Sequence, residues 1–279
     1  MAIDLEVGLD DGRTLQVHDT GPVDDEQLVV LWHHGSPQTG ALLEPLVTAS
    51  AARRIRLLSY GRPSYGGSTH NPGRDIASAA SDVVQIADAL RLERFATMGA
   101  SGGGPHALAC AVLLPDRVPA VVTLAGVAPF SSDYDWFEGM VAPQALQAAL
   151  LGRDARIAFA AIEEFNPASF LPQDYEALRS SWMALNEDVD ASGKWGDDGL
   201  IDDDVALASP WGFDLSQLVA PALFVQGGRD RIVPPEHATQ LLGSAPRGEL
   251  WLRPHDGHIS VLDAAPVALD WILANADRG

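Results

Sequence analysis

A serine among glycines at residues 99–103 constrains the fold of this chain more than any other feature. The five residues read Gly-Ala-Ser-Gly-Gly and fit the pattern G-x-S-x-G, with Ser101 at the centre. Residues 94–98 before it read as a short buried strand, and residues 105–114 after it read as a helix with a wide apolar face. A serine on such a strand-to-helix turn has a strained backbone, and its hydroxyl stands clear of both elements. Small neighbours are needed because the strand and the helix approach closely.

Strand and helix patterns alternate on both sides of this turn. Residues 10–12 (Asp-Asp-Gly) separate two short strand patterns and predict a β-hairpin turn. Such alternation is typical of an α/β fold, with a mostly parallel central sheet, right-handed crossovers and helices on both faces. We expect strands at residues 5–9, 13–18, 27–32, 54–60, 94–98, 120–124, 222–226 and 249–253, and helices at residues 42–52, 75–90, 105–114, 236–242 and 260–274.

The alternation is interrupted once, from residue 128 to residue 210, where the pattern is helical and bulky aromatic residues are frequent. The simplest interpretation is a helical insertion at 128–210 within one α/β core formed by residues 1–127 and 211–279. The insertion holds sixteen Asp and Glu against four Lys and Arg. Three consecutive acids, Asp202, Asp203 and Asp204, lack the offsets of a calcium-binding loop, so we expect a solvated acidic face there.

Composition excludes several classes of function. The 279-residue chain carries a formal net charge of −20, which would repel nucleic acid and an anionic membrane surface. Its single cysteine, Cys110, cannot form an internal disulfide and is expected to be a small core residue. The sequence has neither an apolar run of about 18 residues nor a signal-peptide pattern at its start, which predicts a cytoplasmic protein. It gives no indication of the oligomeric state.

The serine hydroxyl needs a base, an acid that orients the base, and donors for a developing oxyanion. The base candidate is His258, after the strand expected at 249–253, and the acid candidate is Asp230, in the glycine-rich segment after the strand at 222–226. Residues 33–37 (His-His-Gly-Ser-Pro) directly follow the strand at 27–32 and are the candidate oxyanion loop. All of these lie at the carboxyl ends of expected strands.

Other residues compete for these roles. His255 is the strongest rival for the base. Asp256 is a rival for the acid, but it is so close to His258 in sequence that it points elsewhere. The loop at residues 60–68 is interpreted as structural, with Arg62 as a less favoured substrate contact. The remaining histidines are expected to be structural or packed (His33, His34, His106) or at the surface (His18, His70, His237).

These motifs, in this order and in these strand contexts, resemble the α/β-hydrolase superfamily over nearly the whole chain. The resemblance implies that Ser101 is the nucleophile, His258 the general base and acid, and Asp230 the orienting acid. It also implies oxyanion donors at the backbone N–H groups of Ser36 and Gly102, and a cap formed by the insertion. The serine nucleophile argues against the dehalogenase and epoxide-hydrolase branches. The capped arrangement looks most like the branch with proline iminopeptidases and small-molecule esterases.

The resemblance implies a serine hydrolase that cleaves a small carboxylic ester or lactone through an acyl-enzyme, without a cofactor or metal. Two alternatives stay open: an aminopeptidase of the proline-iminopeptidase type, and a non-catalytic protein of the same fold that binds a small ligand. The expected partner is a small-molecule substrate. Residues early in the insertion are the candidates for lining its pocket: Phe130, Trp136, Phe137 and Met140.

Overall fold

The central sheet runs through the whole of a computed structural model that describes residues 3–22, 24 and 27–276. Among these residues it has eight strands in the order β1-β2-β4-β3-β5-β6-β7-β8. The β1–β2 and β2–β4 pairs are antiparallel and all others are parallel, which confirms the predicted mostly parallel sheet. The strands are β1 (Ile3–Gly8), β2 (Thr14–Asp19), β3 (Val29–His33), β4 (Arg56–Tyr60), β5 (Ala96–Ala100), β6 (Val121–Leu124), β7 (Ala222–Gly227) and β8 (Gly248–Arg253).

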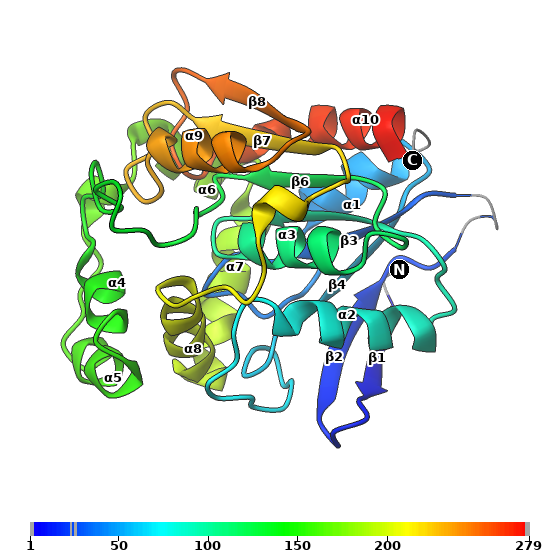
Figure 1. The fold of residues 1–279 in the computed structure, drawn as a ribbon, viewed down its shortest axis with the longest axis horizontal. Helices are drawn as coiled ribbons and strands as arrows, with labels where there is room; N and C mark the ends of the chain where they lie inside the picture. Colours follow the sequence, from blue (N-terminus) through cyan, green and yellow to red (C-terminus); the bar gives the residue numbers. More distant parts are fainter. Residues whose placement is uncertain (1–2, 23, 25–26, 277–279) are drawn as a thin grey trace.

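Helices cover both faces of this sheet (Figure 1). Side chains alternate along a strand, so Leu31 of β3 packs into one core while Val30 and Trp32 pack into the other. The first core is closed by α2 (Ser78–Ala89), α3 (Gly103–Leu113) and α9 (Pro235–Ser244), and the second by α1 (Glu44–Ala51) and α10 (Ala265–Ala276). The inner strands β3, β5, β6 and β7 are therefore buried on both faces, as their apolar sequences predict.

Two helix starts differ from their predicted positions. Helix α2 begins at Ser78, after a turn in which the Asp75 carboxylate accepts the Ser78 N–H at 2.8 Å and the Asp75 carbonyl accepts the Ser78 hydroxyl at 2.6 Å. The last helix opens with a 3₁₀ turn, η4 (Ser260–Ala264), before α10 begins. These shifts affect the ends of the elements and leave their order unchanged.

Five α-helices form the segment between β6 and β7, which we call the insertion (residues 128–210). They are α4 (Gln144–Ala149), α5 (Arg153–Ala160), α6 (Pro172–Arg179), α7 (Met183–Ser192) and α8 (Asp198–Leu207), with short 3₁₀ turns η1 (Pro167–Ser169) and η2 (Gly193–Trp195). A further turn, η3 (Leu215–Gln217), precedes β7. Figure 1 shows α4 and α5 at the edge of the molecule, while α8 lies closer to the sheet. Within the described part of the chain, no helix has the length and apolarity to cross a membrane.

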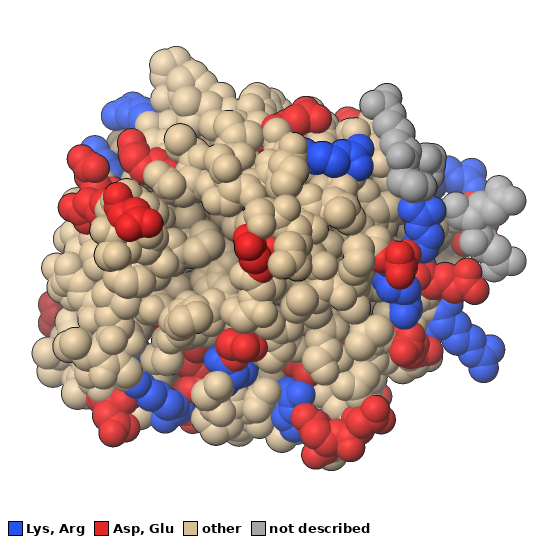
Figure 2. All heavy atoms as spheres, viewed as in Figure 1, with Lys and Arg blue, Asp and Glu red and all other residues tan. Residues whose placement is uncertain are grey.

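The expected solvated face at Asp202, Asp203 and Asp204 is wrong. Their exposed fractions are 3%, 0% and 8%, because α8 turns these acids toward arginines instead of solvent. Four arginines pair with them: Arg62, Arg74, Arg153 and Arg156. Many other acids do lie outside, and Figure 2 shows them gathered mainly around the outline of one face.

Candidate active site

The turn between β5 and α3 holds Ser101 in a backbone conformation that side chains rarely adopt, with φ of 52°. Its backbone N–H donates to the carbonyl of Leu124 at 2.9 Å, which ties the turn to the end of β6. A Cβ at Gly99 would collide with the carbonyl of Gly103, and one at Gly103 with the carbonyl of His33. The glycines are therefore required by the close approach of strand, turn and helix.

Three side chains from the ends of β5, β7 and β8 form a continuous hydrogen-bonded chain. Ser101 Oγ and His258 Nε2 are 3.0 Å apart, and His258 Nδ1 and Asp230 Oδ2 are 2.7 Å apart. Because an ionised carboxylate can only accept, the proton of the neutral ring lies on Nδ1, and Nε2 can accept the serine proton. Asp230 is held in turn by the N–H groups of Ile232 and Val233, which donate to its Oδ1 at 2.8 and 3.0 Å.

Burial and the neighbouring charge have opposite effects on the pKa of His258. Burial lowers the pKa of the imidazole, while the charge of Asp230 and its hydrogen bond raise it, and the net result is a pKa above the ordinary value. The Asp230 side chain is fully buried and that of His258 nearly so. Such a ring can take a proton from the serine near neutral pH and return it to a leaving group.

The loop that carries His258 is hydrogen-bonded to an acid of the insertion, Asp174, which the sequence did not identify as part of the site. Asp174 of α6 is fully buried, and its Oδ1 accepts the N–H groups of Ile259 and Ser260 at 3.0 and 2.8 Å. The same oxygen accepts the Ser260 hydroxyl at 2.8 Å, and Oδ2 accepts the Leu171 N–H at 2.9 Å. Asp174 therefore joins α6 to the residues directly after His258.

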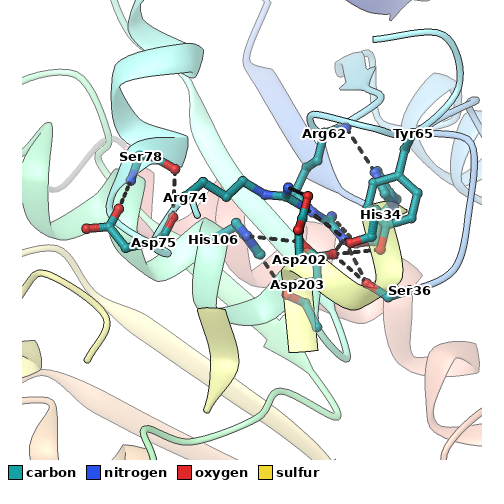
Figure 3. A network of polar contacts seen from close by, with 12 residues as sticks. His34, Ser36, Arg62, Tyr65, Arg74, Asp75, Ser78, His106, Asp202 and Asp203 are labelled. Atoms are coloured by element: carbon teal, nitrogen blue, oxygen red, sulfur yellow. Dashed lines mark hydrogen bonds and ion pairs between the residues drawn. The ribbon is translucent and has the colours of Figure 1, made fainter. Parts of the chain in front are cut away.

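The loop after β3 runs against the Ser101 turn. A Cβ added to Gly35 would lie 3.7 Å from the Cβ of Ser101, and one added to Gly102 would lie 3.1 Å from Ser36 Oγ. The Ser36 hydroxyl donates to Asp203 Oδ2 at 2.7 Å and accepts from Arg62 Nη2 at 2.9 Å (Figure 3). Ser36 and Gly102 thus lie side by side next to Ser101.

A cavity of about 540 Å³ opens beside Ser101 and is also lined by Ser36, Gly102 and His258. That volume lies within the ordinary range of small-molecule sites. Most of its wall is apolar and comes from both the core and the insertion, with members including Leu124, Val127, Met140, Leu146, Phe165, Phe170, Leu178, Leu185, Leu207, Ile232 and Ile259. Its polar members include Arg156, Glu163, Glu164, Asn166, Asn186, Asp204 and Arg231.

Of the four residues expected to line the pocket, Met140 does so and the other three lie elsewhere. Trp136 is 1% exposed, and its indole N–H donates to the Ala128 carbonyl at 2.9 Å. Phe130 and Phe137 stack edge-on against this indole, with ring centroids 5.6 and 5.2 Å away. The chain after β6 packs back onto the core beside α9, so closeness in sequence to the end of β6 did not place these rings over Ser101.

A family model of the α/β-hydrolase fold matches residues 29–265. The chain belongs to this family. Among its relatives, a pimeloyl-[acyl-carrier protein] methyl ester esterase of Nitrosomonas europaea is 28% identical over 222 residues, covering 77% of this chain and 83% of that protein. Two solved structures share the fold. A bromoperoxidase from Bacillus anthracis has a TM-score of 0.74 at 21% identity, covering 99% and 100% of the two chains. An enol-lactonase from Burkholderia xenovorans LB400 has a TM-score of 0.71 at 20% identity, covering 98% and 100%.

The rival residues of this α/β hydrolase have other partners. His255 is exposed, and Asp256 forms an ion pair with Arg253. The expectation that His237 lies at the surface is wrong: it is 1% exposed and bridges the Ala128 N–H and the Trp136 carbonyl at 3.1 and 3.0 Å. Burial lowers its pKa to about 4, which keeps the ring neutral.

Arg62 does not reach the cavity of this α/β hydrolase. It is 1% exposed and lies behind the loop after β3, where its guanidinium contacts the His34 carbonyl, Ser36 and Asp203. Its position agrees with the structural interpretation of the loop at 60–68. In the part of the chain that the structure describes, no group of three or more His, Cys, Asp or Glu residues is arranged to hold a metal ion.

Proposed function

We propose that this protein is a serine hydrolase that cleaves a small carboxylic ester or lactone through an acyl-enzyme. The observation that carries the proposal is the hydrogen-bonded chain from Ser101 through His258 to Asp230 at the edge of a largely apolar cavity. Membership of the α/β-hydrolase fold supports a hydrolase. The choice of an ester or lactone rests on the cavity and on the activities named for some of the relatives.

In the proposed reaction, Ser101 Oγ attacks the carbonyl carbon while His258 Nε2 takes its proton. The tetrahedral intermediate then collapses, the bond to the leaving oxygen breaks, and His258 returns the proton to that oxygen. A water molecule, deprotonated by the same imidazole, then attacks the acyl carbon. The bond from that carbon to Ser101 Oγ breaks, Oγ takes the proton back from His258, and the acid is released. Asp230 holds the ring in the required tautomer and stabilises its charged form throughout.

The backbone N–H groups of Ser36 and Gly102 are the proposed donors to the oxyanion. They belong to the two segments that adjoin Ser101, and negative charge develops on the carbonyl oxygen at that place. The insertion is the proposed cap, because it supplies a large part of the cavity wall around Ser101. An apolar acyl or leaving group suits such a lining.

The test is hydrolysis of p-nitrophenyl esters of increasing acyl length by the wild type and by Ser101→Ala. We expect turnover in the wild type to disappear in the variant, while the matched control Ser244→Ala, at an exposed serine of α9, keeps wild-type turnover. Equal turnover in Ser101→Ala would refute the assignment of the nucleophile. Absence of turnover in the wild type would refute the ester substrate.

Acids in the cavity wall favour one second candidate, an aminopeptidase of the proline-iminopeptidase type. Glu163 and Glu164 both line the cavity, and a carboxylate there could receive the free amino group of a substrate. Glu163 already pairs with Arg156 at 2.9 Å, which leaves Glu164 as the stronger amino-group acceptor. Turnover of an amino-acid p-nitroanilide in preference to the ester would select this candidate. Binding of an apolar ligand without turnover of either would select the non-catalytic alternative.

A further inference from the structure

The carboxylate of Asp203 on α8 accepts hydrogen bonds from four side chains, although Asp203 has no role in the proposed mechanism. Its Oδ2 accepts the Ser36 hydroxyl at 2.7 Å, Arg62 Nη2 at 2.6 Å and the Tyr65 hydroxyl at 2.9 Å. Its Oδ1 accepts Arg74 Nη2 at 2.7 Å. Figure 3 shows these side chains converging on one carboxylate from the loop after β3, the loop after β4 and the segment before α2.

The carboxylate is fully buried, and so is Arg62. Burial alone would raise the pKa of Asp203, but the charges of Arg62 and Arg74 outweigh it and hold the pKa well below the ordinary value. Asp203 is therefore ionised at neutral pH, and its hydrogen bonds are charge-assisted, which makes them short and directional. A side chain bonded to such a group has little freedom to move.

We propose that Asp203 is a positioning residue for the oxyanion site: through the Ser36 hydroxyl it fixes the loop whose backbone N–H faces the developing charge. This inference rests on the proposed function, because it takes Ser36 and Gly102 as the oxyanion donors. Arg62 also holds the Ser36 hydroxyl, since one guanidinium nitrogen donates both to that hydroxyl and to Asp203. The Ser36 hydroxyl is thus held on two sides, and Ser36 also lines the cavity.

The second proposed donor lies against the same buried cluster. His106 Nδ1 and the Gly102 carbonyl are 2.8 Å apart, and the opposite ring nitrogen lies 3.8 Å from Asp203 Oδ1. Burial lowers the pKa of His106 to about 3, so the neutral ring donates from Nδ1 to the carbonyl. Asp203 is therefore bonded to Ser36 and lies across the His106 ring from Gly102, so the insertion that shapes the cavity also packs behind both proposed donors.

The experiment compares Asp203→Asn, Ser36→Ala and the double variant with the wild type. Two readouts are used: steady-state ester hydrolysis, and the rate at which a fluorophosphonate labels Ser101. Asp202→Asn is the matched control, because Asp202 is a buried acid of the same helix that pairs with Arg74 and Arg153, whereas the Ser36 hydroxyl is bonded to Asp203 and Arg62. Circular dichroism and thermal unfolding show which variants are folded.

We expect each single variant to lower kcat and the labelling rate by about 10- to 100-fold, with KM changed by less than about threefold, because the loss is confined to the transition state. The double variant should be no slower than the slower single variant, since both changes break the same link. Asp202→Asn should keep kcat within about twofold of the wild type while unfolding at a lower temperature.

Wild-type kcat and labelling in folded Ser36→Ala would overturn the inference, and so would multiplicative losses in the double variant. If Asp203→Asn does not fold, Ser36→Ala decides alone. A wild type that neither labels at Ser101 nor turns over ester would instead refute the proposed function and the inference with it. Labelling in the wild type with equal labelling in the variants would refute only the role of Asp203.

Discussion

The strand-end loops of the core and the insertion between β6 and β7 differ in how their polar side chains meet their partners. Ser101, Asp230 and His258 each follow a strand within a few residues, and parallel strands place their carboxyl ends along one edge of the sheet. Asp203 of the insertion meets Arg62 across 141 residues of sequence, with no shared motif. In the core, the parallel sheet itself brings the polar side chains at the strand ends together. In the insertion, polar partners meet only because segments that are distant in sequence pack against each other.

The two regions also differ in what their surfaces present. In the insertion Asp203 has no exposed area, while Leu151 and Ile162 are 82% and 75% exposed. In the inner core strands β3, β5, β6 and β7 every apolar residue is buried. Sequence polarity therefore describes burial in the sheet well and misleads in the insertion, where buried arginines from other segments compensate the acids.

The largest expected effect is on the core side of the comparison. Asp230→Asn should lower kcat about 10⁴-fold, equivalent to about 5.5 kcal/mol, because the ring of His258 loses the acceptor that sets its tautomer. The pH–rate profile should also move. Since Asp230 raises the pKa of His258 and burial lowers it, removing the charge should shift the inflection to lower pH. An inflection at the wild-type pH would contradict the assignment of Asp230.

The next prediction distinguishes residues of the insertion that pack in the protein interior from residues that line the cavity. Trp136→Ala should lower the free energy of unfolding by about 3–5 kcal/mol and leave the acyl-length preference unchanged, because the ring is buried away from the cavity. The matched change is Phe165→Ala, at a ring that is 61% exposed and lines the cavity. It should cost less than about 1 kcal/mol and alter the preference. Denaturant unfolding and ester series measure both, and the reverse pattern would refute the placement.

Removing the contact between α6 of the insertion and the loop after β8 should have intermediate effects on stability and on kcat. Asp174→Ala leaves the N–H groups of Ile259 and Ser260 without their acceptor, which should cost about 2–3 kcal/mol of unfolding free energy. Because these residues follow His258, kcat should also fall about 10-fold. Glu176→Ala, at an exposed acid of the same helix, is the control and should change neither quantity. An Asp174→Ala variant with wild-type kcat would show that α6 does not hold the base in place.

The smallest effect is expected at Met140, where the insertion meets the cavity. Met140→Ala enlarges the site by a few methylene volumes, so the ratio of kcat/KM for longer over shorter acyl chains should rise about threefold to tenfold. Stability should change by less than about 2 kcal/mol because the side chain is only partly buried. Competition between two esters of different length measures the ratio directly. A constant ratio would place the acyl group elsewhere in the cavity.

The α/β fold could be predicted, and so could the positions of Ser101, Asp230 and His258 after β5, β7 and β8, because both depend on local sequence patterns. Apolar runs identified buried strands, and the glycines around Ser101 identified the turn, since no larger residue fits between strand and helix. The starts of α2 and α10 could not be predicted as well, because a turn held by Asp75 precedes the first and a 3₁₀ turn precedes the second. Trp136 was misplaced because its partner, His237, lies on α9 far along the chain.

The sequence by itself determined the sheet, the sharp turn that raises Ser101 and the strand ends that carry Asp230 and His258. These follow from side-chain periodicity and from the steric limits of the backbone, which act over a few residues. The tertiary structure alone decided that Asp174 and Asp203 turn inward, Asp174 onto the residues directly after His258 and Asp203 onto Ser36. A buried carboxylate is stable only where distant donors and positive charges surround it, and that environment exists only once the chain has folded.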